Sequence, residues 1–256
     1  MCLITFAYHQ HPEYPLILVA NRDEFYDRPT QDMNYWQDHP DILAGMDLEQ
    51  KGTWLGVNKA GKFTAVTNFR EGGNKETDLK SRGHLTRHFL TQQISAEAYL
   101  QELQTNGSQY GGFNLLLGDH NGLYYGSNKG AEPRRLEPGI YGLSNAHLDT
   151  HWPKVLQAKK LLQARLEGND ISIDALAGVL RSTLTAKDKD LPRTGISYEW
   201  EKQLSSCFIN VEGYGTRATT ILLQNTKGVI QLAEFRFDQS GERGRQDFTL
   251  TTPLIG

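Results

Sequence analysis

Short apolar runs, separated by polar turns, fill the first seventy residues of the chain. The runs CLITFAY (2–8) and LILVAN (16–21) are rich in β-branched and aromatic residues, and HQHPEYP between them carries turn residues. This pattern predicts a β-hairpin. The segment GTWLGVNKAGKFTAVTNF (52–69) predicts a second hairpin, which turns at residues 59–62. Consecutive strand pairs of this kind form antiparallel sheets.

Helical and extended segments then follow one another in groups. Helix starts are predicted at Ser81, Ser95, Thr150 and Ser172. Further strands are predicted at 113–119, 122–128, 139–145, 206–211, 218–225, 228–237 and 247–250. Because strands come in runs and do not alternate with helices, this order disfavours a doubly wound parallel sheet. We predict one domain over residues 1–256, in which two antiparallel sheets stack and helix pairs cover their outer faces.

Composition narrows the classes of partner. The chain is 38% hydrophobic and 22% charged, with a formal net charge of −3, which argues against a general nucleic-acid binder. The basic stretches RGHLTRH (82–88) and EPRR (132–135) contain no aromatic residue and are interpreted as solvated faces. No run approaches the roughly 18 apolar residues of a membrane span, and the first run has no basic leader. We predict a cytoplasmic protein without a transmembrane segment.

One of the two cysteines is the second residue of the chain. Removal of Met1 would make Cys2 the N-terminal residue, with a thiol and a free α-amine in the same residue. An α-amine has a pKa of about 8 in model compounds, which suits it to take a proton from a neighbouring nucleophile. The alternative is a small apolar residue at the start of a buried strand. With Cys207 as the other thiol, there is neither a disulfide framework nor a CxxC metal pattern.

A run of four polar residues, NRDE (21–24), ends the second apolar strand. In a hairpin, this end folds back beside Cys2. Arg22 beside a thiol would favour the thiolate, and Asp23 would accept a hydrogen bond from the α-amine. The alternative is a charged turn with an Arg–Asp pair of little consequence for stability.

Three later stretches place an Asn or an Arg among small residues at a predicted strand end. They are VTNFR (66–70), YGLSN (141–145) and GYGTRATT (213–220). An Asn side chain can donate to a developing oxyanion, and an Arg can anchor a carboxylate. Asn and Gly are also ordinary turn residues, so the chemical interpretation depends on whether the three stretches converge on Cys2.

Six stretches occur in order between residues 2 and 220: CLITFAY, NRDE, GTWLGV, TNFR, YGLSN and YGTRATT. Together they resemble the NRDE family, also called the transport-and-Golgi-organisation family. That family is similar to the N-terminal-nucleophile hydrolases, especially the Cys-type penicillin V acylases and bile-salt hydrolases. The resemblance implies an α+β fold, a four-layer αββα sandwich of two stacked antiparallel sheets flanked by helices.

The resemblance also implies roles for individual residues. Cys2 would be the nucleophile that attacks an amide carbonyl, with Arg22 and Asp23 behind it. Later strands would supply further groups: Asn145 and Arg217 to catalysis, and Asn68, together with Asn21 of the NRDE run, to substrate binding. In the hydrolases the Arg and the Asp are spaced differently, whereas here they are adjacent. Adjacent strand residues point to opposite faces, so we expect one of the two to point away from the thiol.

Two functions from different classes follow. The first is a Cys2-dependent amidohydrolase or acyl-transfer enzyme that acts on a small amide and requires no cofactor. The second uses the same fold as a binding protein for haem or another amphipathic ligand, because the family has been associated with intracellular haem trafficking. No axial ligand is indicated. The histidine pairs His84/His88 and His147/His151 have no acidic or Cys partner nearby and are interpreted as solvated, so no metal site is predicted. The oligomeric state is not indicated.

Overall fold

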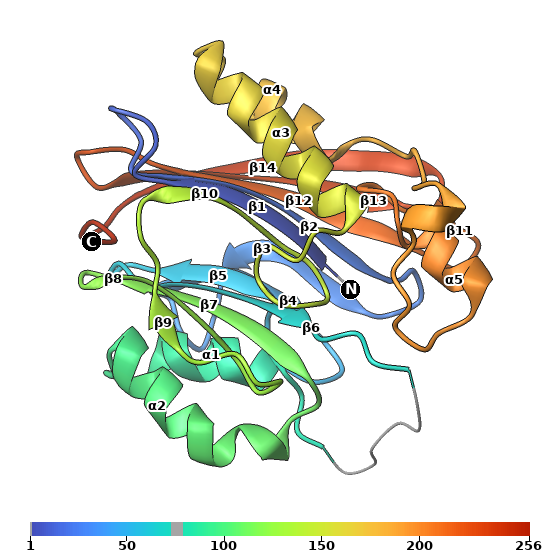
Figure 1. Ribbon diagram of the computed structural model, residues 1–256. Helices are drawn as coiled ribbons and strands as arrows, with labels where there is room; N and C mark the ends of the chain where they lie inside the picture. Colours follow the sequence, from blue (N-terminus) through green and yellow to red (C-terminus); the bar gives the residue numbers. More distant parts are fainter. Residues whose placement is uncertain (1, 73–78) are drawn as a thin grey trace.

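The strands of this computed structural model pair into two antiparallel sheets that lie face to face (Figure 1). The structure describes residues 2–72 and 79–256. We call the sheet that contains the first strand the first sheet and the other the second sheet. In spatial order the first sheet consists of β10 (Gly139–Leu143), β1 (Cys2–Tyr8), β2 (Leu16–Phe25), β12 (Tyr214–Gln224), β13 (Val229–Asp238) and β14 (Gly241–Thr251), with β11 (Asn210–Val211) paired to β12.

The second sheet is a meander, in which every strand pairs with its neighbour in sequence. Its strands are β3 (Thr30–Tyr35), β4 (Ile42–Asp47), β5 (Leu55–Asn58), β6 (Phe63–Asn68), β7 (Phe113–Asp119), β8 (Gly122–Ser127) and β9 (Arg134–Arg135). The hairpins predicted at 2–21 and 52–69 are therefore present, as β1–β2 and β5–β6.

Helices cover the two outer faces. In Figure 1, α1 and α2 lie against the second sheet, and α3 and α4 lie against the first. The helices are α1 (Gly83–Thr91), α2 (Ala96–Asn106), α3 (Pro153–Glu167), α4 (Ile173–Ala177) and α5 (Tyr198–Gln203), and short 3-10 turns occupy Gly107–Gln109, Gly178–Leu180 and Asp188–Asp190. This arrangement confirms the predicted four-layer αββα sandwich.

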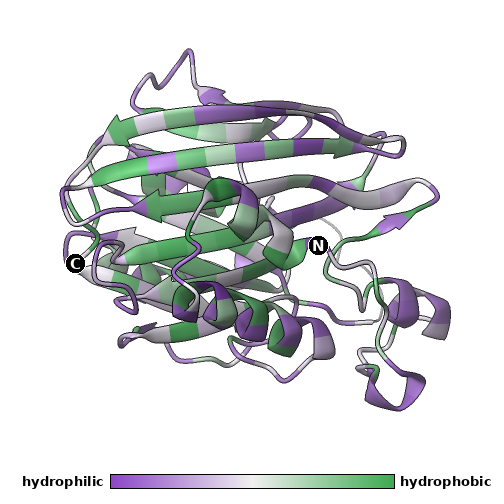
Figure 2. Ribbon diagram, turned by 90° about the horizontal axis from the view of Figure 1, so that it is seen from above, coloured by the Kyte–Doolittle hydropathy of each residue, from purple (hydrophilic) through white to green (hydrophobic). Residues whose placement is uncertain are grey.

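Strand alternation assigns each apolar side chain to one interface. Phe6 and Leu18 point toward the second sheet, where they join Leu116 in a core between the sheets. Val19, one residue further along β2, belongs to a separate core beneath α3 and α4. Each such side chain contributes about 1.5–3 kcal/mol when fully buried, so both faces of the central strands hold the layers together. Figure 2 shows hydrophilic residues where these strands approach the N-terminus.

The structure corrects several predicted elements. The polar segment after residue 29 contains two strands, β3 and β4, which the sequence pattern missed because β3 buries only Met33 fully. Helix α1 begins at Gly83 and has no side-chain cap, so Ser81 is not its N-cap. The helix after Ser172 is short: it ends at Ala177, and a 3-10 turn continues it to Leu180. The sequence pattern predicts no helix over residues 199–203, which belong to α5 in the structure.

Within residues 2–72 and 79–256, no helix is long and apolar enough to cross a bilayer.

Candidate active site

The pairing register of β1 and β2 places Cys2 directly opposite Arg22. Both side chains point toward the second sheet, because they alternate in phase with Ile4 and Ala20 of the core between the sheets. Cys2 is partly exposed, whereas Arg22 is only 6% exposed. The predicted return of the NRDE run to the start of the chain is therefore present in the structure.

The environment of Cys2 raises the pKa of its thiol. Burial is the main cause, and the negative charge of Asp23 adds to it. The guanidinium of Arg22 and a hydrogen bond from the backbone N–H of Asp23 act in the opposite direction but do not cancel the effect of burial. The thiol is consequently protonated near neutral pH, and thiolate formation requires a base.

Arg22 is buried without a carboxylate at ion-pair distance among the described residues. Its Nη1 donates to Thr30 Oγ1 at 3.3 Å, and its Cζ lies 4.4 Å from the ring centroid of Trp54. Burial lowers the pKa of Arg22, but a guanidinium stays charged in proteins. A cation is thus held between the sheets by a neutral hydroxyl and an aromatic face.

Asp23 lies one residue past the Cys2–Arg22 pair, and strand alternation turns its side chain toward the helices that cover the first sheet. As expected from the adjacency of the two residues, it does not share the face of the thiol. Its carboxylate is buried and accepts a hydrogen bond from Thr216 Oγ1 at 2.7 Å. Burial raises the pKa of Asp23, while Lys154, Thr216 and Arg70 lower it.

Lys154, in the first turn of α3, is buried near this carboxylate. Its Nζ has no hydrogen-bond partner in the described part of the chain. Burial and the positive charge of Arg70 lower the pKa of Lys154 to about 8, while Asp23, Cys207 and Cys2 raise it. Lys154 is not among the predicted site residues, because a Lys at a helix start is ordinarily solvated.

Arg70 and Glu201 form a buried ion pair near the same cluster, with Nη1 and Oε2 at 2.9 Å. Glu201 also accepts hydrogen bonds from the backbone N–H and the hydroxyl of Thr194, at 2.8 and 2.6 Å. The backbone N–H of Arg70 donates to Asn145 O at 2.7 Å. Arg70 is the last residue of the VTNFR stretch, of which only Asn68 was predicted as a site residue.

Asn68 and Asn145 meet beside the amino end of β1. Asn145 Nδ2 donates to Asn68 O at 2.9 Å, and Ser144 Oγ donates to Cys2 O at 3.0 Å. The second sheet, through β6, and the segment after β10 are thus joined at the level of Cys2. Two of the three later stretches named in the sequence analysis converge there.

Asn21 lies on the opposite face of the first sheet from Cys2. Its Nδ2 donates to the carbonyls of Leu180 and Cys207 at 3.1 and 2.9 Å, and its Oδ1 accepts from Thr219 Oγ1 at 2.7 Å. The side chain is fully buried and holds the strand to the segments that cover it. Its predicted part in substrate binding gains no support from this geometry, and we leave Asn21 out of the candidate site.

Arg217 sits at a β-bulge of β12, where the pairing with β2 shifts between Thr216 and Ala218. Its Nη1 donates to the carbonyls of Phe25 and Arg28 at 2.8 and 3.2 Å. The positive charge of Arg217 lowers the pKa of Arg22, and both side chains line the same cavity. Arg217 therefore joins the site on the Arg22 side.

Arg82 corrects the interpretation of RGHLTRH as a solvated face. Burial lowers the pKa of Arg82, and the negative charge of a Cys2 thiolate acts to raise it, so the two groups lie within electrostatic reach. Its Nη1 donates to Gly112 O at 3.3 Å. The position of Arg82 just before the apolar residues of α1 could have indicated its burial. Nothing in the sequence connects this helix start with Cys2.

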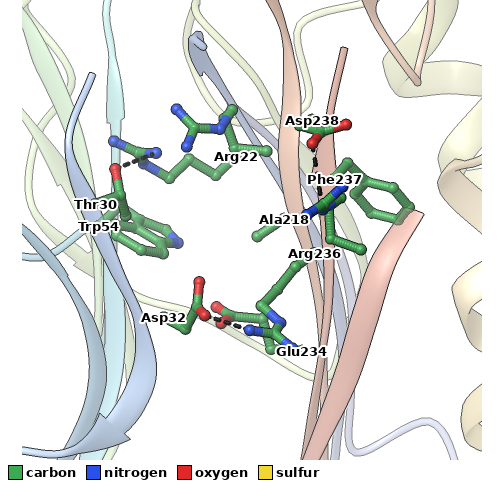
Figure 3. A pocket seen from close by; sticks show the side chains of 11 residues that line it. Arg22, Thr30, Asp32, Trp54, Ala218, Glu234, Arg236, Phe237 and Asp238 are labelled. Atoms are coloured by element: carbon green, nitrogen blue, oxygen red, sulfur yellow. Dashed lines mark hydrogen bonds and ion pairs between the residues drawn. The ribbon is translucent and has the colours of Figure 1, made fainter. Parts of the chain in front are cut away.

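A cavity of about 240 Å³ opens beside Arg22, between the ends of the two sheets (Figure 3). It is bounded by Trp54 on one side and by Ala218 on the other, and charged side chains dominate its wall. Cys2 does not line the cavity, but it lies on the neighbouring strand, directly across from Arg22. No group of three or more metal-ligating side chains occurs among the residues that the structure describes.

Fold and site define a class: four-layer αββα proteins with a thiol at the amino end of an inner strand, opposite a buried arginine. A family model described as Transport and Golgi organisation 2 matches residues 1–239. The chain belongs to this family, as the six stretches indicate.

Two mammalian relatives match nearly the whole chain. The mouse (Mus musculus) "Transport and Golgi organization 2 homolog" is 35% identical over 255 residues, which cover 91% of this chain and 92% of the relative. The human (Homo sapiens) "Transport and Golgi organization protein 2 homolog" is 35% identical over 256 residues, with the same coverage of 91% and 92%.

Among solved structures, a variant of conjugated bile acid hydrolase from Clostridium perfringens aligns with 99% of this chain and 98% of its own. The TM-score is 0.46 and the sequence identity 10%. The layer arrangement given above rests on strand pairing within this chain and not on so distant a likeness.

Proposed function

We propose that the protein is an N-terminal-nucleophile amidohydrolase or acyl-transfer enzyme, with Cys2 as the nucleophile. The observation that carries this proposal is the cross-strand pair of Cys2 and Arg22 beside a charged cavity. A thiol whose pKa is raised by burial needs a base at the same place. The α-amine of Cys2, free after removal of Met1, is that base.

The reaction has two halves. In the first, the α-amine takes the thiol proton and the sulfur attacks the amide carbonyl carbon, so that an S–C bond forms. The C–N bond then breaks, and the α-ammonium gives its proton to the leaving amine. In the second, the α-amine deprotonates a water molecule that attacks the thioester. The C–S bond breaks, the thiolate regains the proton, and a carboxylic acid leaves. An amine in place of water gives acyl transfer.

The neighbouring residues receive roles that match their surroundings. The Arg22 guanidinium favours the thiolate form of Cys2, because its charge lowers the thiol pKa. The Asp23 carboxylate, buried beside the amino end of β1, holds the α-ammonium. The side-chain amides of Asn68 and Asn145 are the proposed donors to the oxyanion, because the Asn145 amide is hydrogen-bonded to the backbone carbonyl of Asn68 at the level of Cys2. Arg217 orients the substrate from the cavity side.

The alternative, a carrier of haem or another amphipathic ligand, stays a prediction. Such a ligand requires an apolar pocket, whereas the cavity beside Arg22 is lined mainly by charged side chains. The enzyme is therefore the function that this site supports better. We also propose a cytoplasmic setting, because a free thiol nucleophile persists in a reducing compartment.

The test is turnover of a panel of aryl amides and thioesters by untagged protein. We expect Cys2→Ala to lower the rate on any accepted substrate at least about a thousandfold. Cys207→Ala is the matched control, because Cys207 is buried in the core beneath α3 and should leave turnover intact. Equal turnover by wild-type protein and Cys2→Ala, or no turnover by the wild-type protein on the whole panel, would overturn the proposal.

A further inference from the structure

The cavity beside Arg22 has two polar ends. In Figure 3, Arg22 lies at one end, and Asp32 and Glu234 lie at the other. Their backbones belong to different layers: Arg22 and Glu234 come from β2 and β13 of the first sheet, and Asp32 comes from β3 of the second. Because both layers contribute to the wall, a bound molecule would contact both sheets.

Most arginine side chains of the cavity wall already interact with a carboxylate or a backbone carbonyl. Arg236 is paired with Asp32, Arg243 with Asp238 at 3.3 Å, and Arg217 donates to backbone carbonyls. Arg22 differs, because within the described ranges its guanidinium donates to the Thr30 hydroxyl, stacks on the Trp54 ring and forms no ion pair with a carboxylate. A planar guanidinium that is stacked on an aromatic face keeps its edge for a carboxylate, which it binds through two parallel hydrogen bonds.

Glu234, at the other end of the cavity, is an acidic side chain that complements the positive charge of Arg22. The residue is 1% exposed, and its Oε1 accepts a hydrogen bond from the backbone N–H of Met33 at 2.8 Å. Its Oε2 has no hydrogen-bond partner in the described part of the chain, although the side chain lines the cavity. A buried carboxyl oxygen without a donor costs free energy unless a ligand supplies one.

We propose that this cavity binds an amino-acid-like group, with its carboxylate against Arg22 and its ammonium against Glu234. The inference rests on the proposed function, because it assigns this group to the substrate whose amide reaches Cys2, across from Arg22. The cavity volume of about 240 Å³ is enough for an amino acid of modest size.

The first experiment measures binding to Cys2→Ala protein, which cannot turn over a substrate, by isothermal titration calorimetry. The probes are L-norvaline, which has both charged groups, pentanoate, which lacks the ammonium, and n-butylamine, which lacks the carboxylate. We expect L-norvaline to bind at least about tenfold more tightly than either single-charge probe. Equal affinity of the three probes, or no binding of L-norvaline up to about 10 mM, would overturn the inference.

Variants then test the two ends separately in the Cys2→Ala background. We expect Glu234→Gln, which keeps the shape of the side chain, to weaken the binding of L-norvaline about tenfold and to leave the binding of pentanoate unchanged. Arg22→Met should weaken the binding of both probes. Asp238→Asn is the control, because Asp238 lines the cavity but is paired with Arg243. An equal loss in Asp238→Asn and Glu234→Gln would contradict the assignment. Binding without turnover by the wild-type protein would disprove the enzyme and keep the site.

Discussion

At the residue scale, one side chain connects the thiol with the cavity. Arg22 lies opposite Cys2 on one side and lines the cavity on the other, and burial gives its charge a longer reach than it would have in water. Asp23, the adjacent residue, acts on the same thiol from the other face of the sheet. The two side chains have opposite effects on the thiol pKa, which makes them separable by mutation.

Substitutions of the two residues should move the reactivity of Cys2 in opposite directions. Arg22→Met removes the charge that lowers the thiol pKa, so the midpoint of the pH–rate profile for alkylation by iodoacetamide should rise. Asp23→Asn removes a charge that raises it, and the midpoint should fall. The rates are followed by peptide mass spectrometry at Cys2. If the midpoint moved in the same direction in both variants, Arg22 and Asp23 would not have opposite effects on the pKa of the Cys2 thiol.

Glu234 should make stability depend on pH. Burial raises its pKa to about 7, a hydrogen bond from Met33 N–H and the charges of Arg236 and Arg22 lower it, and Asp32 raises it. Between the ordinary value of 4.5 and about 7, the folded state keeps a proton that the unfolded chain has lost. The free energy of unfolding therefore falls as pH rises through this window, by up to about 3 kcal/mol.

Urea unfolding at several pH values checks this prediction against Glu234→Gln, which cannot ionise. The free energy of unfolding of the variant should equal that of the wild-type protein near pH 4.5 and exceed it above pH 7. A difference between the two proteins that does not change with pH would show that Glu234 does not carry the proton.

At the element scale, close backbone packing fixes α3 on the first sheet. Gly142 of β10 leaves room for Val155, because a Cβ at this position would lie 2.6 Å from Val155 Cγ1. The contact matters for the site, since α3 also carries Lys154 beside Asp23.

Gly142→Ala should accordingly destabilise the protein by about 1–3 kcal/mol in urea unfolding. Gly178→Ala is the matched control, because its Cβ would meet only Arg165 Nη2 at 3.8 Å and its backbone is helical. We expect the free energy of unfolding of the control variant to stay unchanged or to rise by up to about 1 kcal/mol. Equal losses in the two variants would contradict the packing argument.

The elements show what the sequence pattern could predict. Strands with apolar residues on both faces, such as β1, β2 and β7, were found because burial on both faces produces continuous apolar runs. The strand β3 was missed, because the burial of Met33 alone leaves almost no periodic signal. Helix α5 was missed because it is short, although Ser197 accepts a hydrogen bond from Trp200 N as an N-cap should.

At the scale of the whole molecule, the site forms where the two sheets meet. The pair of Cys2 and Arg22 was predictable, because a hairpin is a local structure whose register follows from its strands. The approach of Arg82, Lys154 and Glu234 was not, because each comes from an element whose position depends on how the layers stack. Single residues within such elements carry no signal of their distant neighbours.

The proposed mechanism requires Cys2 to be a free N-terminal nucleophile. The most direct measurement is the intact mass of untagged protein, before and after a brief treatment with a low dose of iodoacetamide near neutral pH. Cys207 is an internal control, because it is fully buried and burial raises the pKa of its thiol to about 11. We predict loss of Met1 and rapid single labelling at Cys2. Retention of Met1, or labelling at Cys2 no faster than that of a model thiol, would contradict the proposed role of Cys2 as the N-terminal nucleophile.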